Sequence, residues 1–180
     1  MKFNVGCGWR DFGDDWIHID AGDYKHLDSD DIHLYDYEHN SADLIYASHV
    51  IEYFDREEIK KLLSDWKDVL KPNGILRLAV PNFAEIVSLY IKGYNDYKLD
   101  NALGPLYGKM QMGNETIYHK TTYDFSSLKE VLEEVGFKYI RYWDWKQTEH
   151  SEFDDHSQAY YPHMDKENGT LISLNMECVK

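Results

Sequence analysis

The chain has 180 residues, a length typical of one domain, and 43% of them are hydrophobic, which excludes a disordered tail. No stretch approaches the roughly 20 apolar residues that span a bilayer. The formal net charge of −14 argues against nucleic acid as a substrate, because proteins that bind phosphate backbones present basic surfaces.

A strand-like run begins at the second residue, so we expect no signal peptide, no membrane insertion and a cytoplasmic location. Cys7 and Cys178 lie far apart and form no CxxC motif. This spacing favours free thiols in a reducing compartment over a disulfide.

Short apolar runs in the first half of the chain alternate with one strongly periodic helix. The runs predict strands over residues 2–5, 16–19, 32–34 and 44–47. Asp55, with Glu58 three residues later, forms a capping box at the start of the helix. Its apolar stripe, which includes Trp66, recurs at spacings of three and four and predicts a core-facing helix that ends before Pro72.

The second half predicts a strand over 75–80, a helix over 84–91 and an irregular insertion over 93–123. Another helix follows Asp124 or Ser126 and ends at Gly136.

Two strands, over 137–145 and 172–178, close the chain around a polar insertion at 146–168. No helix pattern lies between them, which favours antiparallel pairing. The sequence therefore predicts one α/β domain over 1–180, with a mostly parallel sheet and one antiparallel strand near its edge.

A glycine turn follows the first strand, and an acidic residue follows the second. Gly6-Cys7-Gly8 is separated from Asp20 by only eleven residues, so a loop replaces the usual crossover helix. Such a turn is either a plain tight turn or a place where a ligand meets the backbone, and a carboxylate in this position can accept from ribose hydroxyls. Asp11 stands where a dinucleotide motif has its third glycine, and its charge would repel a pyrophosphate. A ribose ligand without phosphates, such as S-adenosylmethionine, fits better.

Four stretches together carry a resemblance to a known family: residues 3–20, 40–53, 66–81 and 134–137. In this order they resemble the class I S-adenosylmethionine-dependent methyltransferases, and more narrowly the short predicted methyltransferases of bacterial surface-polysaccharide gene clusters. The resemblance implies a Rossmann-like sheet. The chain departs from the pattern by lacking the N-terminal cap helices, by its shortened first crossover, by Asn4 in place of an acidic residue and by Arg10 in place of a frequent third glycine.

The resemblance also implies a set of cofactor contacts. By position, the glycine turn would line the methionine and ribose, Asp20 would hold the ribose hydroxyls, and Tyr35 and Asp36 would face the adenine. The residues after the fourth strand would border the methyl group. The full set is Gly6, Cys7, Gly8, Asp20, Tyr35, Asp36, Ser48 and His49.

Methyl transfer to a hydroxyl gains from a nearby base, and histidine suits neutral pH. His119 lies in a loop that the resemblance places over the methyl-transfer end, and His49 and Asp155 are further candidates. An exposed loop histidine and a strand-end histidine satisfied within the fold are the structural alternatives for His119 and His49.

Residues 150–163 concentrate carboxylates, histidines and tyrosines, which is chemistry typical of sugar binding. The expected acceptor contacts are Tyr118, Lys120, Asp154, Tyr160 and His163. The same run allows a metal site through His150, His156, His163 and Asp155, or a solvated loop. No tight metal-ligand spacing is present, so we expect no metal.

The predicted function is an S-adenosylmethionine-dependent O-methyltransferase. The resemblance implies as acceptor a hydroxyl on a sugar, a nucleotide-linked sugar or a surface-glycan precursor. Ala47-Ser48-His49-Val50 replaces the Asn/Asp-Pro-Pro-aromatic signature of base N-methyltransferases. A degenerate binding module without turnover is the main alternative, and a nicotinamide oxidoreductase is a third. A first strand without helical cover also predicts a homodimer.

Overall fold

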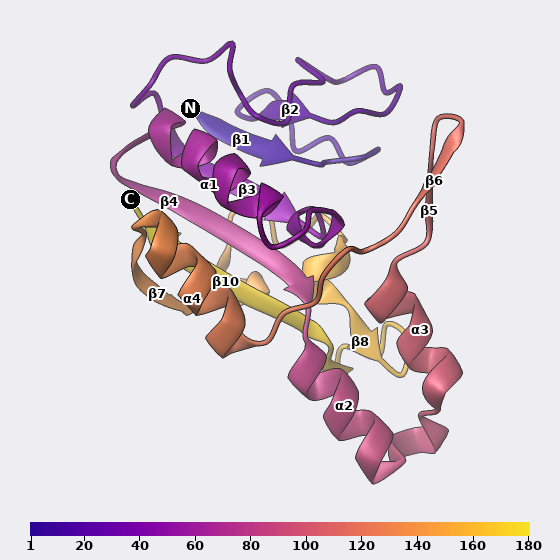
Figure 1. Ribbon diagram of the computed structural model, residues 1–180. Coiled ribbons are helices and arrows are strands. Elements are labelled where there is room, and N and C mark those ends of the chain that lie inside the picture. The colour runs from indigo at the N-terminus through magenta and orange to yellow at the C-terminus, as the bar shows by residue number, and fades with distance from the viewer.

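A six-stranded sheet lies at the centre of the computed structural model, which describes residues 1–180, in the order β2-β1-β3-β4-β10-β7 (Figure 1). The strands are β1 (Lys2–Val5), β2 (Ile17–Ile19), β3 (Ala42–Ser48), β4 (Leu70–Pro81), β7 (Lys138–Tyr142) and β10 (Ser173–Val179). The first four are parallel to one another, and β10 is antiparallel to both β4 and β7. The predicted α/β class, with one antiparallel strand next to the edge, is confirmed.

Two helices, α1 (Glu58–Val69) and α4 (Phe125–Val135), pack against each other on one face of the sheet (Figure 1). Their apolar stripes and the sheet form the main core, and Trp66 is fully buried in it. Burial of each large side chain contributes about 1.5–3 kcal/mol, so this face supplies much of the stability.

The predicted capping bonds are present at both helices. The start of α4 after Asp124 is confirmed, whereas α1 begins at Glu58, with Glu57 as its N-cap, rather than directly after Asp55. Asp55 Oδ1 accepts from the backbone N–H groups of Glu57 and Glu58 at 2.8 Å each, and the Glu58 carboxylate accepts from the Asp55 N–H at 3.2 Å. Asp124 and Ser127 form the corresponding capping box at α4. These local bonds satisfy amides that the first helical turn leaves free.

The opposite face carries no α-helix and is covered by loops and by the short 3₁₀ helix η4 (His156–Gln158). Residues 6–16 cross it as an extended loop, and Phe12 stacks on Tyr46 of β3 and on Phe153, with ring centroids 5.9 Å and 4.6 Å away. Trp143 donates its indole N–H to the Leu78 carbonyl at 2.9 Å. An aromatic layer from two distant segments therefore takes the place of the absent helices.

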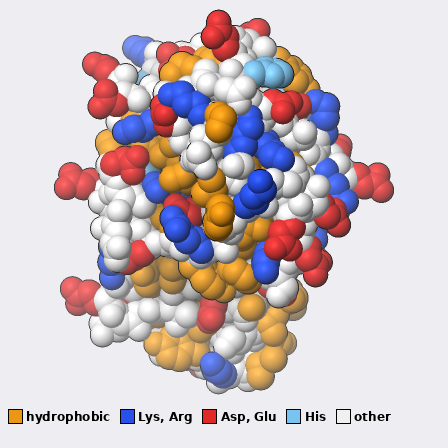
Figure 2. All heavy atoms as spheres, turned by 90° about the vertical axis from the view of Figure 1, so that its left-hand side faces the viewer, with side chains coloured by type: hydrophobic (Ala, Val, Ile, Leu, Met, Phe, Trp, Pro, Cys, Tyr) orange, Lys and Arg blue, Asp and Glu red, His pale blue; other side chains and the backbone are white.

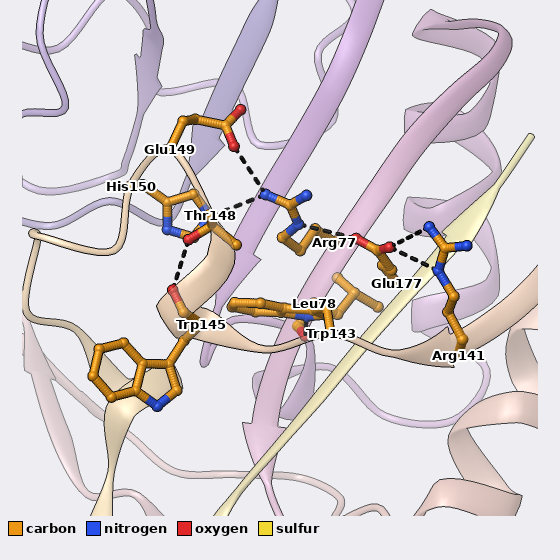
Figure 3. Close-up of polar contacts among 9 residues, drawn as sticks. All are labelled: Arg77, Leu78, Arg141, Trp143, Trp145, Thr148, Glu149, His150 and Glu177. Carbon is orange, nitrogen blue, oxygen red and sulfur yellow. Dashed lines mark hydrogen bonds and ion pairs between the residues drawn. The ribbon is translucent and has the colours of Figure 1, made fainter. Parts of the chain in front are cut away.

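Charged side chains bind the segment that contains Glu149 and His150 to the sheet (Figure 3). Arg77 of β4 contacts Glu149 at 3.4 Å through Nη1 and pairs with Glu177 at 3.1 Å through Nε, and Arg141 pairs with Glu177 at 2.7 Å. Arg77 Nη1 also lies 3.3 Å from His150 Nε2. Burial, with the neighbouring guanidinium, lowers the pKa of His150 to about 4, so its neutral ring can accept from Arg77.

The segment 93–123, expected to be irregular, is largely ordered. After α2 (Phe83–Lys92) come a short turn of helix, η2 (Tyr94–Asp96), then α3 (Leu99–Tyr107) and a projecting hairpin of β5 (Met110–Met112) and β6 (Glu115–Ile117) (Figure 1). Pro105 inside α3 and the exposure of both hairpin strands explain the missing periodicity. The remaining short elements are η1 (Ile51–Tyr53), η3 (Trp145–Gln147), η4 (His156–Gln158), β8 (Tyr160–Tyr161) and β9 (Thr170–Leu171).

The strand predicted over 32–34 does not form. Leu34 has a left-handed φ of +61° and fills the core, and only Ser29 bridges to β2 in this region. The Asp31 carboxylate accepts from the N–H groups of His33 and Tyr35 at 2.9 Å and 2.7 Å. These turn bonds occupy the amides that a strand ladder would have used.

A group of basic side chains lies at the edge formed by the amino ends of the parallel strands, although the whole chain is acidic. Lys and Arg side chains gather in the central part of this face (Figure 2). Lys180 donates to the Leu70 and Asp68 carbonyls at 2.7 Å and 3.3 Å, and Lys71 pairs with Asp43 at 2.6 Å. Lys180 thus caps carbonyls at the end of α1, where a positive charge is favourable.

Both cysteines are buried and free, and no helix reaches the length and apolarity that a bilayer crossing demands. The expected homodimer would cover a bare first strand. In the structure Phe3, Asn4 and Val5 are already buried by their own chain, so this face gives the dimer no support and it stays a prediction.

Phe12→Ala should lower the free energy of unfolding by about 3–5 kcal/mol, because the ring is a centre of the aromatic layer. Urea denaturation measures the change. Tyr90→Ala, at a half-exposed ring on α2, is the control and should stay within about 0.5 kcal/mol of wild type. Equal stabilities for the two variants would contradict the layer's role.

Candidate active site

The glycine loop lies directly against the segment that follows β3. Gly6 and Gly8 have left-handed φ values of +69° and +58°. A Cβ added to Gly6 would clash with Val50 Cγ2. Only glycine therefore allows the end of β1 to approach the residues after β3 so closely.

Asp20 joins the two turns beside it. Its Oδ2 accepts from the Gly8 N–H at 2.8 Å, and its Oδ1 accepts from the Gly22 N–H at 2.7 Å. A carboxylate has about four acceptor positions, so two stay free for other donors. Burial, with Asp20 nearby, raises the pKa of Cys7 to about 12, so Cys7 stays a neutral thiol. The structure thus brings Gly6, Cys7, Gly8 and Asp20 together.

The amides of this loop bond within the protein. The N–H groups of Gly6 and Cys7 donate to the Ile19 carbonyl at 2.7 Å and 3.3 Å, and that of Arg10 donates to the Cys7 carbonyl at 3.2 Å. Many glycine loops lead into a helix and point free amides at an anion. This loop leads into no helix and has few amides to offer.

Tyr35 and Asp36 are not brought to Asp20. The Tyr35 hydroxyl donates to Asp65 of α1 at 3.1 Å and its ring stacks on His33, and Asp36 is exposed. The aromatic ring beside Gly22 and Asp20 is instead that of Tyr24, which a Cβ on Gly22 would strike.

Three buried groups meet after β3. His49 Nδ1 lies 3.2 Å from Oε1 of Glu52 in η1, and His119 Nε2 lies 3.7 Å from the same oxygen. The ring of His156 lies 5.0 Å from that of His49. The structure therefore brings together His49 and His119, two of the predicted catalytic residues, around a carboxyl group that is fully buried.

Burial keeps this cluster uncharged. It raises the pKa of Glu52 to about 8 and lowers those of His49, His119 and His156 below their usual range. The Glu52 oxygens and His49 Nε2 have no aligned hydrogen-bond partner. At neutral pH the cluster is a protonated carboxyl group beside neutral imidazoles, because charges without counter-ions are costly to bury.

His119 is fixed with one nitrogen toward Glu52. Its Nδ1 lies 3.1 Å from the Pro105 carbonyl, which assigns the proton to Nδ1 and leaves Nε2 as acceptor. The Tyr53 ring meets it edge-on at 4.6 Å, and Gly108 packs so closely that a Cβ there would clash with the imidazole. A neutral imidazole with a free Nε2 is the form that accepts a proton.

Asp155 and Ser48 belong to the far face of the sheet. Both Asp155 oxygens are engaged, one accepting from the Tyr46 hydroxyl at 2.6 Å and the other from the Ser157 N–H at 2.8 Å. Ser48 ends β3, and its Oγ is buried without a partner. The catalytic role of Asp155 stays a prediction.

The five predicted acceptor contacts do not converge. Tyr118 and His163 are exposed, Lys120 pairs with Glu58 at 2.8 Å, and Asp154 pairs with Lys166 at 3.0 Å. Tyr160 lines a groove of about 610 Å³ together with Trp143, Trp145, Asn82 and Asn175, among others. No group of three or more His, Cys, Asp or Glu side chains is arranged to hold a metal ion.

Sequence patterns missed Glu52 as a functional residue. An acidic residue three positions after His49, in the apolar context of Val50 and Ile51, is the signal that could have found it. Its burial depends on the 118–122 loop, whose Lys120 N–H donates to the Glu52 carbonyl at 2.8 Å.

Residues 17–78 match the family model described as a methyltransferase domain. The matched stretch begins after the glycine loop. No curated protein matches the chain at a significant level. Similar solved structures include S-adenosylmethionine-dependent methyltransferases from Archaeoglobus fulgidus (16% identity, TM-score 0.58, 99% of this chain and 85% of that one) and Mesorhizobium loti (15%, 0.56, 99% and 90%). One from Methanosarcina mazei is 14% identical, with a TM-score of 0.54 over 99% of this chain and 89% of that one.

The fold is therefore that of class I methyltransferases. The matched methyltransferase domain implies S-adenosylmethionine as the cofactor. The residues present fit this group. Asp20 keeps acceptor positions for ribose hydroxyls, and the buried Ser48 Oγ and His49 Nε2 lack partners at the end of β3.

Glu52→Gln should change how stability depends on pH. The ordinary pKa of 4.5 rises to about 8 on folding, so the folded state holds a proton that the unfolded state loses between these values. The contribution of Glu52 is complete below pH 4.5 and falls by about 1.4 kcal/mol per pH unit up to pH 8.

The lowered pKa values of His49, His119 and His156 act in the opposite direction, but they are present in both proteins. Urea denaturation from pH 5 to 8 should therefore show the variant gaining stability relative to wild type as pH rises. A constant difference would contradict a protonated Glu52.

Proposed function

We propose that this protein is an S-adenosylmethionine-dependent methyltransferase that acts on a hydroxyl group. The observation that carries the proposal is the contact of Gly6 with Val50. It sets the glycine loop and Asp20 directly against the segment that holds His49 and Glu52. The glycine loop with Asp20, which is suited to a nucleoside, and the segment with His49 and Glu52 thus lie at the same end of the sheet.

When bound, the cofactor supplies an electrophilic methyl group on a positively charged sulfur. Asp20 would accept from the ribose hydroxyls, and the glycine loop would line the cofactor. His119 Nε2 would take the proton from the acceptor hydroxyl, while the Pro105 carbonyl keeps its Nδ1 protonated. Glu52 lies between the two imidazoles. The rest of the catalysis is alignment of the reacting groups.

We propose a sugar, a nucleotide-linked sugar or a glycan precursor as the acceptor. The groove beside β4 and β10 supports this choice, because it combines Trp and Tyr rings with Asn82, Asp144 and Asn175. Aromatic faces bordered by amides and carboxylates are suited to sugar rings. Tyr118, Lys120, Asp154 and His163 remain predicted acceptor contacts.

A binding module without turnover is the second candidate. The amides of the glycine loop already donate within the protein, and no crossover helix lies between β1 and β2. Both features favour this candidate, because they reduce the number of groups that can hold a cofactor. Binding and turnover measured separately distinguish the two.

His119→Ala should lower kcat by about 10²–10⁴-fold, because it removes the base, and should leave cofactor affinity nearly unchanged. Turnover is measured by methyl transfer to a panel of sugars and sugar nucleotides, and affinity by calorimetry. His39→Ala, at an exposed histidine, is the matched control. Equal losses in kcat and affinity would contradict the assigned role.

Asp20→Asn should weaken both S-adenosylmethionine and S-adenosylhomocysteine by about tenfold or more, because a charged acceptor contributes about 1.5–3 kcal/mol to its hydrogen bonds. The amide oxygen can still accept from one loop amide, which limits disruption of the turn. Calorimetry with wild type is the reference. Failure of wild type to bind either ligand would overturn the enzyme proposal, and binding without methylation of any acceptor would favour the binding module.

A further inference from the structure

We propose that Arg10 is the receptor for the α-carboxylate at the amino-acid end of the methyl donor. The inference rests on the proposed function and adds to it the residue that recognises this end of the cofactor.

A carboxylate beside the glycine loop needs a side-chain cation, because the backbone there has few free N–H donors. The N–H groups of Gly6, Cys7, Gly8 and Arg10 all donate within the protein. Residues 6–16 form no helix, so no helix N-terminus faces this place. A carboxylate there would lack the amide donors that commonly bind anions.

Arg10 is held in place by one nitrogen and leaves the others free. Its Nε donates to the Asp154 carbonyl at 2.7 Å, and its guanidinium lies 4.9 Å from the centroid of the exposed Trp9 ring. Nη1 lies 4.0 Å from the position that a Cβ on Gly8 would take. The free edge of the guanidinium therefore borders the glycine loop.

Arg10 has no carboxylate partner, although acidic residues outnumber basic ones by 33 to 19. Arg77 and Arg141 both pair with Glu177, whereas no Asp or Glu lies within ion-pair distance of Arg10. The guanidinium of Arg10, beside the glycine loop, is therefore free to pair with an external anion.

The charge of Arg10 also acts on the histidines at the proposed transfer end. After burial and the neighbouring imidazoles, Arg10 contributes to the lowered pKa of His49, and after burial it does so at His156. Its bond to the Asp154 carbonyl, two residues before His156, likewise places Arg10 near this histidine as well as near Gly8. In the donor the sulfur carries the ribose, the methyl group and the amino-acid chain as three separate branches. With the ribose at Asp20 and the methyl end at His49, the third branch would carry its carboxylate toward Arg10 beside the glycine loop.

A ligand pair that differs in the amino-acid end tests the proposal. S-adenosylhomocysteine carries the carboxylate, and 5′-methylthioadenosine keeps the nucleoside and sulfur but lacks it. Calorimetry on Arg10→Gln should show a loss of about tenfold or more for the first ligand and a change of less than about twofold for the second. Arg10→Lys should give an intermediate loss, because it keeps the charge without the planar fork.

Arg141→Gln, at a mostly exposed arginine on β7, is the matched control and should change neither affinity. Equal weakening of both ligands by Arg10→Gln would show a purely structural role and overturn the proposal. Unchanged binding of S-adenosylhomocysteine, with a raised KM for an anionic acceptor, would assign Arg10 to the acceptor and also overturn it. Binding of neither ligand to wild type would instead show that the proposed function fails.

Discussion

The structure depends on how the helix-free face of its sheet is kept from water. A buried parallel sheet needs cover on both faces, and α1 and α4 supply only one. The Tyr46–Asp155 hydrogen bond, at 2.6 Å, joins the middle of the sheet to a segment more than a hundred residues later. Around it, Phe12, Trp143 and His150 form the aromatic layer. Loops thus cover the face that helices cover in an ordinary parallel α/β sheet.

This cover has consequences for the candidate site. The loop that carries Phe12 also carries Gly6, Gly8 and Arg10, and the segment that carries Asp155 continues into His156 beside His49. Packing on the far face therefore holds the residues at the carboxyl ends of β1 and β3. Arg10 is tied to the second segment by its bond to the Asp154 carbonyl, so the two loops position each other.

The buried titratable groups of the candidate site are uncharged. Glu52 and the imidazoles of His49 and His119 lie in contact without a counter-ion, and burial drives each toward its uncharged form. A neutral imidazole can accept a proton, and an uncharged pocket does not compete with Asp20 for a positively charged ligand. The acidic surface and the neutral interior thus act at different places on a cationic donor.

The sequence by itself determined the elements whose signals are local. The capping boxes at Asp55 and Asp124, the apolar stripe around Trp66, the glycine turn with Asp20, and the alternation in the last strand all rest on neighbours within a few residues, and the structure has each of them. Where local signals compete, as at 32–34, the hydrogen bonds of the Asp31 carboxylate form a turn, although the apolar run predicts a strand. Pro105 lies inside α3, and the surrounding segment has no clear periodicity, so the sequence did not predict this helix.

Only the tertiary structure decided which distant residues meet. His49 and His119 are seventy residues apart and converge on the buried Glu52. The placement of Tyr35 on α1, the commitment of Asp155 to Tyr46 and the unpaired state of Arg10 are likewise invisible in the sequence. The physical reason is that local patterns record the period and the caps of single elements. Long-range contacts depend on which surfaces remain to be covered once those elements have packed.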